Sequence, residues 1–285
     1  MILYRCESHA MDQPANVEST PTLQQTSPSA RLPVIFIGHG SPMNALEENR
    51  FTEAWRALGE ATPAPRAVLA ISAHWLTDGV AVTAMPAPRT IHDFGGFPQA
   101  LFDMRYPAPG DPALATQIQT LLAPLNVALD QTWGLDHGVW SVLKHVYPDA
   151  NVPVLQLSID ANQPPSWHFA LGQRLAVLRE QGVLIVGTGN VVHNLRTMRF
   201  DGSGAQPWAE RFNMQVRQAI ERRDFSAVVD YRQWGQDAAL SVPSDEHFLP
   251  LLYVLGATRS DDRLTLLSDE IVGSSISMLS VVAGG

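Results

Sequence analysis

The sequence predicts an α/β protein, folded as a single domain with a central mixed β-sheet flanked by helices on both faces. Wholly apolar runs of strand length occur at residues 34–37, 68–71 and 183–186, as in strands buried on both faces. Longer segments with apolar residues at helical spacing lie between such runs. Strand and helix patterns alternate along most of the 285 residues, which is typical of the α/β class, and no repeat or second domain boundary interrupts them.

Composition excludes several classes of function. The net charge of −9 and the lack of a basic run argue against nucleic acid as a partner. Cys6 is the only cysteine, so neither an internal disulfide framework nor a cysteine-based zinc site can form. No apolar run approaches the roughly 20 residues that cross a bilayer. Charged residues stand where a signal peptide needs an apolar core. We therefore expect a cytoplasmic protein without a membrane partner.

The first half of the chain is expected to alternate between strands and helices after an N-terminal leader. Residues 1–31 are rich in Ser, Thr, Gln and Pro, which predicts a disordered or loosely ordered leader before a catalytic domain at 32–285. Ser41 and Pro42 offer a helix start before a helix at 47–58. Residues 79–85 alternate like a strand and are expected to pair beside strand 68–72. The irregular segment 86–111 carries four aromatic residues and is predicted to be an ordered lid.

The second half continues the same pattern. Ser244 and the acids after it predict a helix start, with the helix running through 248–255. The remaining predictions are helices at 112–122, up to about 146, 167–180, 208–222 and near 225–231, and strands at 127–129, 154–157, 183–187, 264–268 and 271–282.

Five of the nine histidines end a strand, follow a glycine or an acid, or begin a helix: His39, His74, His137, His193 and His247. Any one alone would more often be structural, but neutral imidazole is the commonest protein ligand for iron and zinc. Together they predict a histidine-rich metal site built from distant segments, although no local metal motif such as HExxH is present. His9, His145 and His168 lack such surroundings and are assigned no chemistry.

Six motifs occur in a characteristic order along the chain: GHGSPMNAL, SAHW, IHDFGGFP, DHGVW, GTGNVVHN and SDEHFLPL. This set resembles the class III extradiol ring-cleavage dioxygenases, and more narrowly their bacterial DOPA 4,5-dioxygenase-like subgroup. The resemblance extends over about residues 32–283. It implies a single α/β domain and a non-haem, metal-dependent enzyme that opens the ring of a DOPA-like catechol with O₂. A small aromatic diol and O₂ are then the partners, and a homodimer is allowed.

The resemblance also implies roles for individual residues. His39 and His74 match two metal ligands, and His193 and His247 match positions associated with the metal. The wider superfamily uses a glutamate as third ligand, so both Glu246 and His247 remain open. The cofactor would be one divalent ion, Fe(II) for dioxygenase activity or Zn(II) as found in purified relatives. His137 matches the catalytic acid/base that contacts the catechol, and relatives also use the His193 position as a catalytic base.

Four further residues are expected to contact the substrate. His92 and Phe94 belong to the lid, and Trp75 could flank an aromatic ring. Asp136 could orient the ring of His137, or could equally be a turn residue. Two other functions stay open on the same residues. Four histidines without a carboxylate suit Zn(II), whose bound water would make a hydrolase. The fold also occurs in non-catalytic binding proteins.

Overall fold

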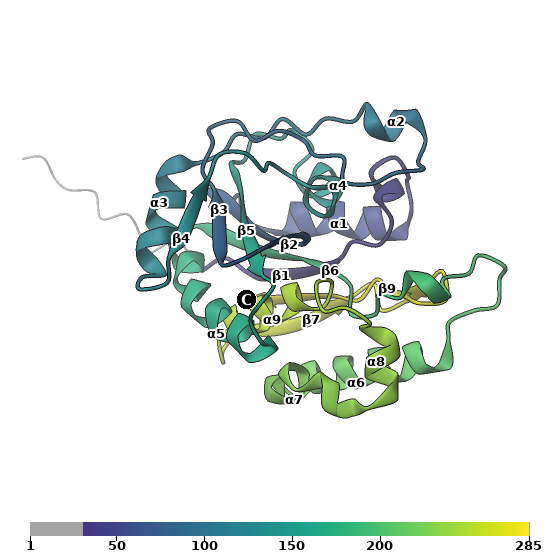
Figure 1. The fold of residues 1–285 in the computed structure, drawn as a ribbon. Coiled ribbons are helices and arrows are strands. Elements are labelled where there is room, and N and C mark those ends of the chain that lie inside the picture. The colour runs from purple at the N-terminus through teal and green to yellow at the C-terminus, as the bar shows by residue number, and fades with distance from the viewer. Residues whose placement is uncertain (1–30, 285) are drawn as a thin grey trace, which may run out of the picture.

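The computed structural model describes residues 31–284, which form one α/β domain with helices on both faces of a mixed sheet (Figure 1). The predicted fold class is confirmed. The predicted leader lies outside the described residues except for its last residue, Arg31. Within the described part, no helix combines the length and the apolar character that crossing a membrane requires.

The central sheet of the described chain has eight strands in the order β4-β3-β5-β2-β6-β1-β10-β7. The core strands β5, β2, β6 and β1 are parallel, whereas β10 and β7 join antiparallel at one edge. The strands are β1 (Val34–Gly38), β2 (Ala67–Thr77), β3 (Val80–Thr83), β4 (Val127–Asp130), β5 (Val154–Asp160), β6 (Val183–Gly189), β7 (Arg263–Leu267) and β10 (Ser280–Gly284), with a separate hairpin of β8 (Ile271–Val272) and β9 (Ile276–Ser277).

Nine α-helices surround this sheet in residues 31–284. They are α1 (Arg50–Ala61), α2 (Gln99–Phe102), α3 (Pro112–Leu121), α4 (His137–Val146), α5 (Pro165–Leu175), α6 (Pro207–Glu221), α7 (Phe225–Val229), α8 (Gln236–Ser241) and α9 (Leu249–Ala257). Successive residues of a strand point to opposite faces, and β1 follows this rule. Ile35 and Ile37 pack in the core beneath α1 and α4, whereas Val34 and Phe36 pack in the core that contains α5 and α9. Burial on both faces explains why the run is wholly apolar.

Two helices begin later than the sequence suggested. The helix expected from residue 47 starts at Arg50, because Asn49 forms a capping box with Thr52. Ser41 caps a short 3₁₀ helix, Pro42–Ala45, instead. The helix expected from Ser244 starts at Leu249, because the carbonyl of Asp245 accepts the amides of residues 248 and 249 in a preceding turn. His247 therefore lies in a turn in front of α9.

The prediction that residues 79–85 pair beside the strand at 68–72 is wrong. Residues 80–83 pair with β5 and β4, and β5 lies between β3 and β2. The side chain of Ser158 in β5 explains the arrangement. Its hydroxyl oxygen lies 2.6 Å from that of Thr77 in β2 and accepts the amide of Ala81 in β3 at 2.8 Å. β5 is buried along its whole length, so the central position satisfies both of its faces.

One buried arginine closes the sheet at the end opposite the histidines. Arg179 lies in the 3₁₀ turn Ala176–Gln181 that follows α5, and its guanidinium pairs with Asp262 at 2.6 Å with both side chains fully buried. The same guanidinium donates to the carbonyls of Leu32, Ala257 and Ala283. These carbonyls lie just before β1, at the end of α9 and in β10. A buried charge is tolerated here because every donor direction meets an acceptor.

Candidate metal centre

His39 follows β1 directly, at the carboxyl ends of the parallel strands, where open α/β sheets bind ligands. Its amide donates to the carbonyl of Gly189 in β6, and its carbonyl accepts the side-chain amide of Asn44. Gly40 adopts a positive φ of 61°, a conformation that favours glycine, so the chain can turn away immediately after His39. The imidazole is 2% exposed.

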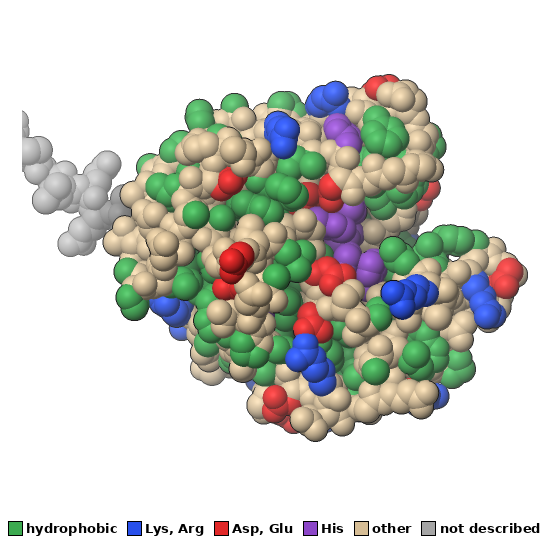
Figure 2. Space-filling model, viewed as in Figure 1, with side chains coloured by type: hydrophobic (Ala, Val, Ile, Leu, Met, Phe, Trp, Pro, Cys, Tyr) green, Lys and Arg blue, Asp and Glu red, His purple; other side chains and the backbone are tan. Residues whose placement is uncertain are grey.

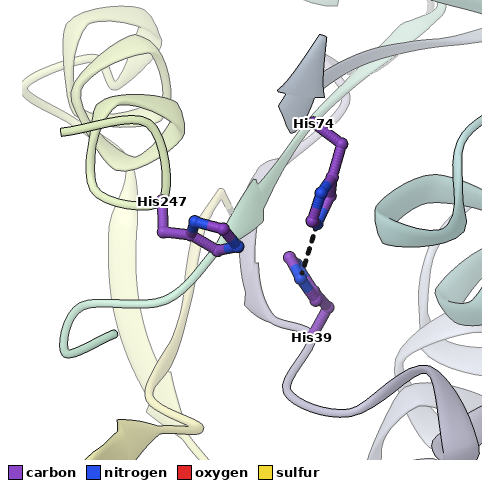
Figure 3. A group of neighbouring side chains, drawn as sticks. All are labelled: His39, His74 and His247. Carbon is purple, nitrogen blue, oxygen red and sulfur yellow. Dashed lines mark hydrogen bonds between the residues drawn. The ribbon is translucent and has the colours of Figure 1, made fainter. Parts of the chain in front are cut away.

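His74 and His247 converge on His39 from two other segments. His74 belongs to β2, and its Nε2 lies 3.2 Å from Nε2 of His39. His247 lies in the turn before α9, and Figure 3 shows its ring directed toward the other two. The three residues each offer a ring nitrogen within 4.8 Å of the others. Segments separated by more than 200 residues of sequence thus form one group.

The residues of this group fit a divalent transition metal. Burial and the neighbouring histidines lower the pKa of His39, His74 and His247, so each ring is neutral with a lone pair available. The Nδ1 atom of His39 is buried without a hydrogen-bond partner, and its Nε2 faces the nitrogen of His74. The Nε2 contact can be a hydrogen bond between the two neutral rings, so the unused hydrogen-bonding capacity of His39 is at Nδ1. Three imidazoles form a donor set that suits iron, zinc and copper.

Glu246 contacts the imidazole of His247. Its Oε1 lies 3.2 Å from Nδ1 of His247 and also accepts the hydroxyl of Ser244 at 2.8 Å. A carboxylate on one ring nitrogen orients an imidazole and leaves the other nitrogen free for a metal. The imidazole of His247 groups with His39 and His74, and Glu246 contacts that imidazole.

His193 lies next to this group rather than inside it. Its ring stacks on that of His247, with centroids 3.4 Å apart and planes at 10°. It belongs to a neighbouring set of possible ligands with Glu246 and His247. Burial lowers the pKa of His193 to about 4, so the ring is neutral at physiological pH.

His137 is the first residue of α4, and its ring lies 4.0 Å from that of His74 and 5.6 Å from that of His39, centroid to centroid. Phe94 of the lid packs edge-on against it at 5.5 Å. Gly138 permits this close packing, because a Cβ at that position would lie 2.8 Å from Cδ2 of His74. All five histidines that the sequence selected therefore meet in one place.

The sequence analysis missed Asp93, to which it gave no role. One carboxylate oxygen of Asp93 lies 3.0 Å from Nδ1 of His137 and 3.4 Å from Nδ1 of His74, and the other accepts the amide of His137. Burial alone would raise the pKa of Asp93, but its contacts with His137 and His74 outweigh burial and lower it. The position beside His92 in the IHDF motif was the available signal.

The other expected substrate contacts lie elsewhere or further out. Asp136 is fully buried, and its carboxylate accepts from Ser72 and Gln156, both at 2.7 Å, rather than from the ring of His137. Trp75 is buried and stacks on Trp133 at 5.5 Å and 4°. His92 contacts the carbonyl of Met104 within the lid. Among residues 31–284, no aromatic contact joins Trp75 or His92 to the five site histidines.

On the surface, histidine side chains form a row down a hollow across one face of the molecule, with acidic side chains beside them (Figure 2). The group is therefore reachable from solvent on one side. His74 and Asp93 retain side-chain exposures of 18% and 17%, whereas His39 is buried. The arrangement combines buried ligand atoms with an open approach, as a catalytic metal site requires.

Comparison with known proteins gives a consistent result. Residues 33–282 match the family model described as the catalytic LigB subunit of aromatic ring-opening dioxygenase. The chain is 50% identical to the 4,5-DOPA dioxygenase extradiol of Escherichia coli K12, covering 90% of this chain and 96% of that one. It is 37% identical to the enzyme of the same name from Beta vulgaris, over 85% and 92% of the two chains.

A crystal structure of an uncharacterized Escherichia coli K12 protein also matches, with a TM-score of 0.79 and 45% identity, covering 89% of this chain and all of that one. The family match spans every strand of the central sheet except the last two residues of β10, and all five site histidines. The chain belongs to the LigB family of extradiol aromatic ring-opening dioxygenases.

Proposed function

We propose that this protein is a metal-dependent extradiol dioxygenase that opens the ring of a catechol bearing a small polar side chain, such as DOPA, with O₂ as the second substrate. The observation that carries the proposal is the convergence of buried His39, His74 and His247 beside His137 and His193. The names of the bacterial and plant relatives support the substrate class. Family membership favours this reading over a zinc hydrolase or a binding protein.

In this proposal, His39, His74 and His247 hold one divalent ion, with Fe(II) as the working metal. Three ligands on one side of an iron leave coordination positions for exogenous molecules. When bound, the ion supplies an electron path between the electron-rich catechol ring and O₂. Glu246 supports the site through Nδ1 of His247 rather than as a ligand.

His137 and His193 carry the protons. In this role an imidazole takes a proton from a catechol hydroxyl, and the resulting imidazolium returns it to an oxygen of the opening ring. For His193, the pKa of about 4 keeps the ring in its basic form at rest. For His137, Nδ1 faces Asp93, which leaves Nε2 as the nitrogen that can meet substrate.

The lid excludes water from the reacting ring. Phe94 packs on His137 and also contacts Phe97 and Phe102, so an apolar wall borders the acid/base on the lid side. A dry pocket strengthens the electrostatic contacts with the catecholate and suppresses side reactions. Two further expectations stay with the proposal: a cytoplasmic location and a homodimer.

The test is anaerobic reconstitution of the metal-free protein with Fe(II), followed by a panel of catechols in an oxygen-electrode cell. The expected result is one O₂ consumed per catechol, with a yellow ring-opened product and the highest kcat/KM for DOPA-like substrates. Protein loaded with Zn(II) serves as the control and should consume none. If folded, Fe(II)-loaded protein took up no O₂ with any catechol, the proposed activity would be refuted.

A further inference from the structure

Asp93 lies on the lid segment, 19 residues after His74 and 44 residues before His137, the two histidines it contacts. Its backbone is at the surface, but its side chain is only 17% exposed because the carboxylate turns inward. The neighbouring lid residues are anchored to α4 and to the loop before it. The indole of Trp140 donates to the carbonyl of Ile91 at 2.8 Å, and the amide of Ile91 donates to the carbonyl of Leu135. The position of Asp93 therefore depends on the path of the lid.

The first contact of Asp93 is with the start of α4. The first amides of a helix have no partner inside the helix, and the preceding side chain usually accepts one of them. Asp136 occupies that preceding position but makes no such bond, since Ser72 and Gln156 bind its carboxylate. Asp93 accepts the amide of His137 at 2.9 Å in its place. A lid residue thus supplies the cap of the helix that carries the acid/base.

The second contact is with two imidazoles. The other carboxylate oxygen of Asp93 lies 3.0 Å from Nδ1 of His137 and 3.4 Å from Nδ1 of His74. A carboxylate at Nδ1 favours the tautomer with a proton there and a free lone pair on Nε2. For His74, Nε2 is the atom that faces His39. For His137, Nε2 is the remaining nitrogen. One oxygen of Asp93 therefore lies beside Nδ1 of both a proposed ligand and the proposed acid/base.

We propose that Asp93 is a positioning residue through which the lid sets the orientation of His74 and His137, so that the metal centre and the acid/base are complete only with the lid in place. The inference rests on the proposed metal centre, with His39, His74 and His247 as ligands. Asp93 acts on that centre without touching the ion. Loss of its carboxylate should therefore weaken metal binding and slow turnover, but leave the ligand set intact.

Two substitutions separate the roles of Asp93. In Asp93→Asn, the amide oxygen can accept from the amide of His137 or from an imidazole, but not from both. In Asp93→Ser, a short hydroxyl can still accept the amide of His137 but cannot reach the rings. Asp103→Asn is the matched control, because Asp103 is an exposed acid of the same lid whose partner is Gln99. The fold of each variant is checked by near-UV circular dichroism.

The readouts are the dissociation constant for Zn²⁺ by chelator competition, the visible spectrum of the Co²⁺-loaded protein, and kcat and KM after Fe(II) loading. Both Asp93 variants should bind Zn²⁺ about 10- to 100-fold more weakly than wild type, which is the usual cost of losing a group that orients a ligand. Their Co²⁺ spectra should keep the wild-type band positions. Their kcat should fall more than KM rises, and Asp103→Asn should match wild type within about twofold.

Three outcomes would overturn the inference. Equal Zn²⁺ affinity and kcat in wild type and both folded Asp93 variants would remove Asp93 from the site. A Co²⁺ spectrum with shifted bands in the Asp93 variants would make Asp93 a ligand through the His74, Asp93 and His137 group. A wild-type protein that binds no metal would refute the proposed centre, and the inference with it.

Discussion

His168 and His39 are both almost completely buried, yet their ring nitrogens have different surroundings. Nδ1 of His168 lies 2.9 Å from the hydroxyl of Tyr253, and its Nε2 lies 3.3 Å from the carbonyl of Gln163. In His39, Nδ1 has no partner and Nε2 faces another imidazole nitrogen. A buried polar group without a partner costs free energy, so it persists where a function requires it. The hydrogen bonding of the ring nitrogens, rather than burial, distinguishes His168 from His39.

The largest expected effect is the loss of metal binding when one of the three proposed ligands is removed, a loss that replacing His168 should not cause. His39→Ala, His74→Ala and His247→Ala should each lose stoichiometric Zn²⁺ or Fe²⁺ binding, because only two imidazoles of the proposed ligand set remain. Metal content after dialysis, read by atomic absorption, measures this. His168→Gln should retain full metal content. Retention of one metal per chain in any of the three alanine variants would remove that residue from the ligand set.

His137 should separate catalysis from metal binding. His137→Asn removes the proposed acid/base while His39, His74 and His247 stay in place, so kcat should fall by about 10²- to 10⁴-fold. Metal content should stay at one per chain. His145→Gln is the control on the same helix, since His145 bonds to the carbonyl of Asn44 and lies outside the group. Unchanged turnover in the His137 variant would exclude it from the mechanism.

The contribution of His168 to the stability of the fold should depend on pH. Burial lowers the pKa of His168 to about 4, whereas an unfolded chain protonates this residue near 6.5. The unfolded state therefore binds the extra proton first on acidification. The contribution of neutral His168 to the free energy of unfolding is complete above about pH 6.5 and decreases as the pH falls to about 4.

Urea unfolding of metal-free protein at several pH values measures this effect. Between pH 6.5 and 4, wild type should lose about 3 kcal/mol more of its unfolding free energy than His168→Gln, which cannot take up a proton. Parallel pH curves for the two proteins would show that His168 is not held neutral by the fold.

The smallest expected effect tests how closely the site is packed. In Gly138→Ala, the added Cβ would lie 2.8 Å from both Cδ2 of His74 and Oγ of Ser72, so the ring of His74 must move. Metal affinity should weaken about tenfold, at the lower end of the cost of disturbing ligand orientation. Gly95→Ala is the matched control, because no atom lies within 4 Å of a Cβ there. Isothermal titration with Zn²⁺ compares the two, and identical affinities would show that His74 tolerates the displacement.

Much of the fold and the histidine group could be predicted from the sequence, because both depend on patterns within short segments. Apolar runs that bury both faces of a strand identify the central sheet, and a histidine at the end of such a run must lie at its carboxyl edge. The order of strands could not be predicted in full. The place of β5 between β2 and β3 depends on contacts such as those of Ser158, which join residues distant in sequence.

The role of Asp93 could not be predicted from local sequence patterns, for a related reason. A lid without regular structure has no periodicity that fixes where its side chains point, so its contacts follow from tertiary packing alone. Asp136, directly beside His137 in sequence, was the natural candidate for its carboxylate partner. The chain turns Asp136 toward Ser72 and Gln156 instead and brings Asp93 in from 44 residues away.

The guanidinium of Arg179 couples the stabilities of the two ends of the described chain. It holds the carbonyl before the first strand and a carbonyl of the last strand at once, and Arg31 binds the same Asp262 from outside. Truncations that remove Leu32 from one side or Ala283 from the other each take an acceptor from a single buried cation, and their effects on stability should not be additive. Arg179 thus ties both ends of the described chain together, at the end of the sheet opposite the histidines.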